Sequence, residues 1–156
     1  MLRQAAHGPV HTLAAQSRAM ASLRIFHEGR LRFVCAATLR GRAFISDPAD
    51  PESIARTATG RVPYAARRSG DGAPPDCWTP REWRQLHRSI REPGVTVADR
   101  QDAVPGICCV SAPVWRPNGA CAGAVTLLVR SDTLPSHLPD MVSHTASRIG
   151  AALRRP

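Results

Sequence analysis

The sequence contains no lysine: all 21 of its basic residues are arginine. This usage is typical of a GC-rich genome and does not by itself indicate a basic binding surface. The formal net charge of +9 nevertheless favours acidic ligands and polyanions through long-range attraction. However, the arginines are scattered from Arg3 to Arg155 without a long basic run, and three Phe, three Trp and one Tyr offer little base stacking. We therefore do not expect this segment to bind DNA directly.

Long apolar runs are also missing. No stretch approaches the roughly 20 apolar residues that span a bilayer, so the composition argues against a membrane protein. The first 27 residues contain no acidic residue, as in a transit peptide, but they lack the apolar block of a secretion signal. We expect a cytoplasmic protein.

The five cysteines form no CxxC pair, and their number is odd. The adjacent Cys108 and Cys109 would point to opposite faces of a strand, so they cannot bind one metal ion together. Reduced, buried thiols are the simplest interpretation in the cytosol. We expect neither a metal site nor a cofactor.

The chain has 156 residues, of which 43% are hydrophobic, and this is enough for one domain with a real core. Residues 1–9 are polar and show no periodicity, which predicts a disordered amino terminus. The expected domain therefore covers residues 10–156.

The stretch from Gly106 to Arg130 gives the clearest structural signal in the sequence. It consists of two apolar runs, 107–115 and 120–129, on either side of Arg116-Pro117-Asn118-Gly119. The Asn-Gly pair supplies the positive φ angles that a tight hairpin turn needs. The pattern predicts the central hairpin of a sheet.

Alternation divides this hairpin into two different faces. The apolar face should pack under helices and comprises Cys108, Val110, Ala112, Val114, Cys121, Gly123, Val125, Leu127 and Val129. The mixed face, which suits the wall of a small-ligand pocket, comprises Cys109, Ser111, Pro113, Trp115, Ala122, Ala124, Thr126 and Leu128. An equally supported interpretation is that Ser111 and Thr126 merely hydrogen-bond across the strands.

Further elements surround the central hairpin. Helices are expected after Val10, from Pro80 to about Arg91 behind a Thr79-x-x-Glu82 capping box, and from Ser136 to the end. Strands are expected at Ser22–Glu28 and Leu31–Ala37, which form a hairpin, and at Arg42–Ser46 and Val95–Ala98, with Asp99 at the end of the last strand.

The segment between residues 51 and 75 gives weaker signals. Thr59–Pro63 suggests a loop, Tyr64–Ser69 a short helix, and Gly70–Pro75 the most flexible place in the molecule. Antiparallel strands with helices gathered mainly on one face predict an α+β layered domain.

The order of these elements resembles the effector-binding domain of the IclR family of bacterial transcriptional regulators, which has a GAF-like fold. The similarity runs from Leu13 to Arg155. It is strongest in ASLRIFHEGRLRFVCAATLR (21–40), in the region 94–129 with Asp99, Gly106, VSAPV and the Asn-Gly turn, and in the ending RIGAALRR. The resemblance implies a domain that binds a small organic or aromatic acid and thereby alters the DNA affinity of a separate winged helix-turn-helix domain.

Carried over by position, the resemblance implies a pocket formed by Asp99, Ile107, Cys109, Thr126 and Leu128, with Ser111 nearby by the face argument. The chain differs from the family pattern in the segment 63–72. Family members carry small residues there, including a glycine-alanine pair whose amides can hold a carboxylate, whereas this chain has Arg67 and Arg68. These arginines either bind a carboxylate in a bidentate manner, fill or spoil the pocket, or form a solvated pair on a helix surface.

The chain differs from the family pattern in two further ways, one at the lid of the pocket and one at the amino terminus. The Gly70–Pro75 linker lies where the family continues a helix, which suggests a degenerate pocket lid. No winged helix-turn-helix of the usual length precedes the effector region, so we expect no direct DNA contact by this chain alone.

Two alternatives to a sensor remain open. A cysteine-dependent enzyme would use Cys109 as nucleophile, His87 or His144 as base, and Asp99 as the orienting group, but the sequence does not bring these residues together. We therefore do not expect an enzyme. A dimerisation module without a ligand would pair with copies of itself or with full-length relatives through the Ser136–Arg155 helix.

Overall fold

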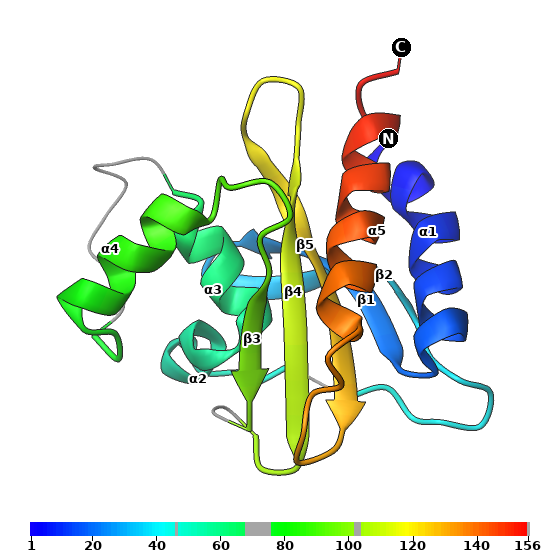
Figure 1. Cartoon of the computed structure of the whole chain (residues 1–156), viewed down its shortest axis with the longest axis horizontal. Coiled ribbons are helices and arrows are strands. Elements are labelled where there is room, and N and C mark those ends of the chain that lie inside the picture. The colour runs from blue at the N-terminus through cyan, green and yellow to red at the C-terminus, as the bar shows by residue number, and fades with distance from the viewer. Residues whose placement is uncertain (46, 68–75, 102–103, 156) are drawn as a thin grey trace.

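The computed structural model describes residues 1–45, 47–67, 76–101 and 104–155 (Figure 1). In chain order, the elements are α1 (Leu2–Ser17), β1 (Met20–His27), β2 (Arg30–Ala37), α2 (Pro51–Arg56), α3 (Ala58–Ala65), α4 (Pro80–Ser89), β3 (Val97–Arg100), β4 (Ile107–Trp115), β5 (Cys121–Arg130) and α5 (Leu138–Ala152).

The five strands form one antiparallel sheet in the order β2-β1-β5-β4-β3. Both expected hairpins, β1–β2 and β4–β5, are present. They join because β1 pairs with β5, with Ser22 opposite Thr126 and Arg24 opposite Ala124. The first hairpin therefore extends the sheet on one side of the central hairpin, and β3 extends it on the other.

The turns of the two hairpins differ. In the first, both Glu28 and Gly29 have positive φ angles (50° and 73°), as a two-residue hairpin turn requires. In the second, Gly119 has a positive φ (80°) and Asn118 does not; the Asn118 side chain instead accepts a hydrogen bond from the Ala120 amide at 3.1 Å. The expected role of the Asn-Gly pair is therefore correct for Gly119 but wrong for Asn118.

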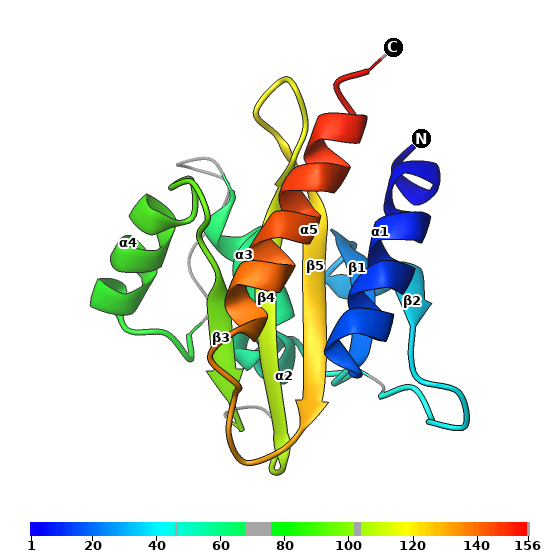
Figure 2. The same cartoon turned by 45° about the vertical axis from the view of Figure 1, so that its right-hand side comes forward.

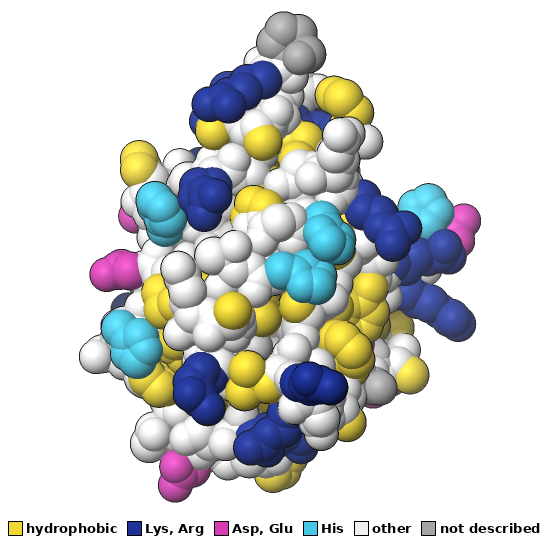
Figure 3. Space-filling model, turned by 90° about the vertical axis from the view of Figure 1, so that its right-hand side faces the viewer, with side chains coloured by type: hydrophobic (Ala, Val, Ile, Leu, Met, Phe, Trp, Pro, Cys, Tyr) yellow, Lys and Arg dark blue, Asp and Glu magenta, His cyan; other side chains and the backbone are white. Residues whose placement is uncertain are grey.

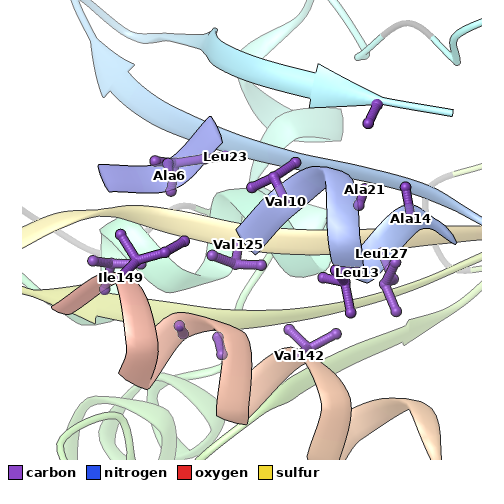
Figure 4. Close-up of a cluster of buried hydrophobic side chains, with 14 of the residues drawn as sticks. Ala6, Val10, Leu13, Ala14, Ala21, Leu23, Val125, Leu127, Val142 and Ile149 are labelled. Atoms are coloured by element: carbon purple, nitrogen blue, oxygen red, sulfur yellow. The ribbon is translucent and has the colours of Figure 1, made fainter. Parts of the chain in front are cut away.

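The two long helices, α1 and α5, pack on one face of the sheet, α1 over β1 and β2 and α5 mainly over β4 (Figure 2). Their apolar side chains meet those of the sheet in the larger core, part of which is drawn in Figure 4. On the last helix, the sequence predicts an apolar stripe of Leu138, Met141, Val142, Thr145, Ile149, Ala152 and Leu153. It is confirmed for Leu138, Val142, Ile149 and Leu153, which belong to this core, whereas Ala152 is exposed.

The structure differs from the expectation at the amino terminus, where residues 2–9 form the first half of α1. Ala6, Val10, Leu13 and Ala14 are buried on one side of this helix, at most 3% exposed. Their spacing is that of a helical apolar stripe, but alanine contributes little to a hydrophobicity pattern. The packing of this stripe on the sheet holds the terminus in place.

On the other face of the sheet lies the short helix α3, with α2 and α4 packed beside it (Figure 1). The expected α+β fold with an antiparallel sheet is confirmed, and the two long helices share one face as expected. The sequence did not predict that this second face would also be covered. Here α3 packs on β4 and β5, and Leu86 and Ile90 at the end of α4 join the smaller core beneath it.

Two capped helices replace the irregular segment expected after residue 51. Asp50 caps α2 by accepting from the Ser53 amide at 2.8 Å, and Thr57 caps α3 by accepting from the Gly60 amide at 2.9 Å. The loop expected over Thr59–Pro63 is wrong, because these residues belong to α3. The helix tolerates Pro63 because the residue lies near its end, where the missing N–H removes a single helical hydrogen bond. Gly60 is required by close packing, since a Cβ there would collide with the carbonyl oxygen of Ile54.

Other expectations shift or fail locally. The capping box at Thr79 and Glu82 is confirmed, and α4 begins at Pro80. The strand after it begins two residues later than expected, so Asp99 lies within β3. The strand expected at Arg42–Ser46 is absent from its described part, because residues 42–45 have no regular secondary structure and pair with no strand. The short helix expected from Tyr64 is wrong in its described part, since α3 already ends at Ala65; Ser69 and the linker Gly70–Pro75 lie outside the described residues.

The surface formed by α1 and α5 shows Arg and His side chains far more often than Asp and Glu (Figure 3). None of the helices in the described part of the chain is both long and apolar enough to cross a bilayer.

Candidate ligand-binding site

The mixed face of the central hairpin is buried beneath α3. Cys109 pairs with Leu128 and Ser111 pairs with Thr126 across β4 and β5, while Asp99 on β3 lies opposite Cys109. The predicted division into two faces is confirmed along most of the hairpin. It is wrong for Ala122 and Cys121, which exchange faces because a bulge between Val114 and Trp115 changes the register near the turn.

A small cavity lies on this face. Asp99, Ile107, Cys109 and Leu128 border it, together with Ile45, Asp47, Pro48, Thr57, Thr59 and Val104. Four of the residues expected to bind a ligand therefore meet at one place. The volume is about 20 Å³, which is room for roughly one water molecule, so the cavity is closed to an organic acid in this conformation.

Three hydroxyl groups lie next to this cavity. The Thr126 Oγ1 atom is 2.6 Å from Ser111 Oγ and 2.8 Å from Thr59 Oγ1, and the Ser111 hydroxyl also donates to Thr59 at 3.4 Å. All three side chains are buried. The cross-strand hydrogen bond considered for Ser111 and Thr126 is thus present, and Thr59 extends it to α3. Ser111 and Thr126 do not border the cavity themselves; they support Thr59, which does.

A buried ion pair lies beside the hydroxyl groups. The Arg24 Nε atom is 2.8 Å from Asp47 Oδ2, and the two side chains are 0% and 16% exposed. The guanidinium also stacks on Phe33, with Cζ 4.4 Å from the ring centre. Burial lowers the pKa of Arg24, and the charge of Asp47 opposes that shift. Burial likewise raises the pKa of Asp47, against the effect of Arg24.

The Nη1 and Nη2 atoms of Arg24 have no hydrogen-bond partner among the described residues. A buried cationic group normally has its donors satisfied, because an unpaired one keeps the full cost of losing its water. The contact with Asp47 is at Nε, and even there it is an ion pair at short distance without the geometry of a hydrogen bond. The guanidinium of Arg24 can therefore donate hydrogen bonds to an anion that reaches it from solvent.

An open groove of about 370 Å³ reaches Arg24 from the surface. Arg67 and Arg91 also line it, together with Thr59 and small or apolar residues, and no described residue of the lining is acidic. Arg67 stacks on Tyr64 with its Cζ 4.5 Å from the ring centre, and Arg91 stacks on Trp115 at 4.8 Å. These contacts hold both arginines at the mouth of the groove.

The residues predicted to bind a ligand line two different spaces, the groove and the small cavity. Arg67 follows the end of α3 by two residues and lies in the groove, not at the cavity next to Asp99. Arg68 lies outside the described residues. Thr59 lines both spaces, and the Arg24–Asp47 pair joins a groove residue to a cavity residue. The pair thus lies between the two spaces.

The arrangement does not support cysteine catalysis. Burial raises the pKa of Cys109 to about 12, so the sulfur is a neutral thiol near neutral pH and a poor nucleophile. His87 Nδ1 lies 3.0 Å from the carbonyl oxygen of Ala65, and His144 is exposed on α5, across the sheet from Cys109. The described residues also contain no cluster of three or more His, Cys, Asp or Glu side chains that could hold a metal ion.

The sequence did not reveal the most informative residues, Arg24, Asp47 and Thr59. Arg24 alternates with Leu23 and Ile25, which predicts an exposed arginine in a two-stranded hairpin. The burial of Arg24 could have been predicted if the pairing of β1 with β5 had been known. With that pairing, Arg24 falls on the same face as Thr126, in the interior of the sheet. No comparable signal exists for Asp47, which lies outside any helix or strand.

Comparisons with known proteins agree on the fold. No protein-family model matches the sequence, and no curated protein matches it significantly. Among solved structures, the chain is similar to HmgR from Pseudomonas aeruginosa (TM-score 0.80, 17% identity, covering 98% of this chain and 67% of that one). It is also similar to IclR from Thermotoga maritima (TM-score 0.75, 16% identity, covering 99% and 69%).

A third structure narrows the similarity to one domain. The C-terminal domain of the Escherichia coli transcriptional regulator KdgR aligns over 99% of both chains, with a TM-score of 0.73 and 14% identity. The chain thus spans about two thirds of the first two proteins but nearly all of this isolated domain. The described chain has the fold of the C-terminal domain of IclR-type transcriptional regulators.

Proposed function

We propose that this chain is a sensing domain of a transcriptional regulator and that it binds a small organic acid between α3 and the sheet. The observation that carries the proposal is the groove lined by Arg24, Arg67 and Arg91 and by no described acidic residue. The groove opens over the same sheet face as the buried cavity next to Asp99 and Cys109. Similarity in fold to transcriptional regulators supports the regulatory role.

An acid is favoured over a neutral ligand by the electrostatics of this groove. Guanidinium groups hold carboxylates through paired, charge-assisted hydrogen bonds. Arg24 is the strongest of the three, because it is buried and its attraction is weakly screened by solvent. The apolar residues Ile107 and Leu128 favour an acid whose remaining atoms are largely hydrocarbon.

Thermal unfolding at fixed ionic strength tests this proposal. Acetate, pyruvate and benzoate are compared with chloride, and benzamide serves as the neutral counterpart of benzoate. Ligand binding raises the melting temperature with concentration as RT ln(1 + [L]/Kd). We expect stabilisation by at least one carboxylate, none by benzamide, and a weaker effect in Arg67→Gln.

A different result would favour the dimerisation module. In that case the domain would form oligomers at equilibrium, and no carboxylate would change its melting temperature. The exposed Arg42→Gln variant provides the matched control for Arg67→Gln, because it removes an arginine that does not line the groove.

A further inference from the structure

The Arg24–Asp47 contact differs from an ordinary surface ion pair. Arg56 and Glu52 lie four residues apart on α2, and their side chains are 49% and 66% exposed. Arg24 is instead on an interior strand, and its partner comes from the irregular segment between β2 and α2. Asp47 thus brings a carboxylate to a buried guanidinium from a part of the chain that no helix or strand holds in place.

We infer that Asp47 occupies the anion position of Arg24 in the empty domain and that an incoming organic acid binds by replacing it. This inference rests on the proposed function and deepens it. It assigns Arg24 as the residue that holds the carboxylate of the ligand and Asp47 as its internal competitor.

The geometry favours such an exchange. Asp47 reaches Nε and leaves Nη1 and Nη2 without protein partners among the described residues. A free carboxylate entering through the groove can orient both of its oxygens toward two guanidinium nitrogens, which gives two parallel hydrogen bonds. The ligand therefore satisfies donors that Asp47 does not.

The charge balance beside Arg24 also favours replacement of Asp47 by the carboxylate of the ligand. Removing Asp47 alone would leave a bare guanidinium in the protein interior, which is strongly unfavourable. When one carboxylate enters as another leaves, the net charge beside Arg24 stays the same. The released Asp47 moves toward solvent, where burial no longer raises its pKa.

The exchange explains how a cavity of about 20 Å³ can belong to a ligand site. Asp47 borders that cavity together with its chain neighbours Pro48 and Ile45, so displacing Asp47 enlarges it. Thr59 borders both spaces, and the enlarged cavity becomes continuous with the groove. The ligand would be a monocarboxylic acid with its charged end at Arg24 and its apolar part toward Ile107 and Leu128.

Chemical rescue tests this inference directly. Asp47→Ala removes the internal carboxylate, and we expect a lower melting temperature in chloride that acetate restores but acetamide does not. The control is Glu52→Ala, which removes the carboxylate from the exposed Arg56 pair and should show no acetate-specific recovery. If Asp47→Ala does not fold in chloride, the same comparison is made on the yield of refolded protein, and Asp47→Asn is measured in parallel.

Binding of benzoate provides the second measurement. Loss of the competitor should tighten benzoate binding to Asp47→Ala or Asp47→Asn by about 10- to 100-fold, the equivalent of one hydrogen bond to a charged group. Binding should be lost in Arg24→Met. Equal acetate effects in Asp47→Ala and Glu52→Ala would overturn the inference, as would unchanged benzoate affinity in both Asp47 variants.

The two proposals can fail separately. If benzoate stabilises the unaltered protein but binds equally well to the Arg24→Met and Asp47→Ala variants, the sensing role stands and the exchange at Arg24 is wrong. If acetate rescues Asp47→Ala but no larger acid stabilises any form of the protein, the Arg24 anion site stands and the sensing role fails.

Discussion

The hydroxyl groups of Ser111 and Thr126 face each other at 2.6 Å between β4 and β5, and neither side chain reaches solvent. Thr59 completes the group from α3. Three hydrogen-bonding groups thus fasten a helix to the centre of the sheet, at the rim of the cavity where a ligand is proposed to bind.

Thr126→Val should therefore be destabilising. The change keeps the shape of the side chain but leaves Ser111 and Thr59 without their shared partner, at a cost of about 1–3 kcal/mol. Urea unfolding measures the loss. Thr145→Val is the control, because that hydroxyl bonds to the Met141 carbonyl within its own helix, and its removal should cost less. Equal costs for the two variants would contradict a special role for the Thr126 hydroxyl.

Gly60→Ala should weaken the junction between α2 and α3. The added methyl group would meet the backbone carbonyl of Ile54, which cannot rotate away as a side chain could. Overpacking of this kind costs about 1–3 kcal/mol or more. Gly8→Ala makes the same change in α1 with nothing within 4 Å, and it should stabilise the helix by roughly 0.5–1 kcal/mol. The opposite signs of the two effects, measured by urea unfolding, check the packing of α2 against α3.

Cys109 should resist alkylation. Its pKa of about 12 leaves very little thiolate near neutral pH, and its side chain is buried. Burial raises the pKa of the Cys109 thiol in the folded state. The contribution of this neutral thiol to the stability of the fold is therefore fully present below the ordinary thiol pKa of about 9 and is lost as the pH rises toward 12. Iodoacetamide labelling at pH 8, followed by mass spectrometry, should modify the partly exposed Cys77 well before Cys109. Equal labelling rates in the folded protein would contradict the buried position.

Ala6→Asp should destabilise the whole domain, although the residue lies in a segment whose sequence suggests disorder. Ala6 is 0% exposed in the core between α1 and the sheet, so the variant buries an unpaired carboxylate there. The neighbouring Gln4→Asp change is exposed on the same helix and should have little effect. Thermal unfolding separates the two, and a melting temperature unchanged by Ala6→Asp would show that α1 does not pack as described.

The parts of the fold that could be predicted are those specified by local sequence. The hairpin between Ser22 and Ala37, the capping box at Thr79 and the two faces around Ser111 and Thr126 each depend on a few neighbouring residues. The segment 51–66 could not be predicted, because its caps and its close contact at Gly60 make sense only once α2 and α3 lie together on the sheet.

The residues of the candidate site likewise fall into those that could be predicted from local sequence and those that could not. Alternation and family resemblance identified Asp99, Ile107, Cys109 and Leu128, all of which border one cavity. They did not identify Arg24 or Asp47, since that pair joins two segments distant in sequence and its burial depends on which strands are neighbours. Strand order is a property of the whole sheet, and no local pattern encodes it.

The pairing of β1 with β5 also has a consequence for how the molecule is assembled. Arg24 and Ala124 are partners although 100 positions separate them in the chain. Bringing such distant segments together carries a large loop-closure entropy, which slows folding. On a ribosome, the β1–β2 hairpin emerges before β5, so the edge of β1 that pairs with β5 stays unpaired until the intervening residues have been synthesised. The surroundings of Arg24 are therefore completed only after β5 has been synthesised, and chaperones can act on the unpaired hairpin during that interval.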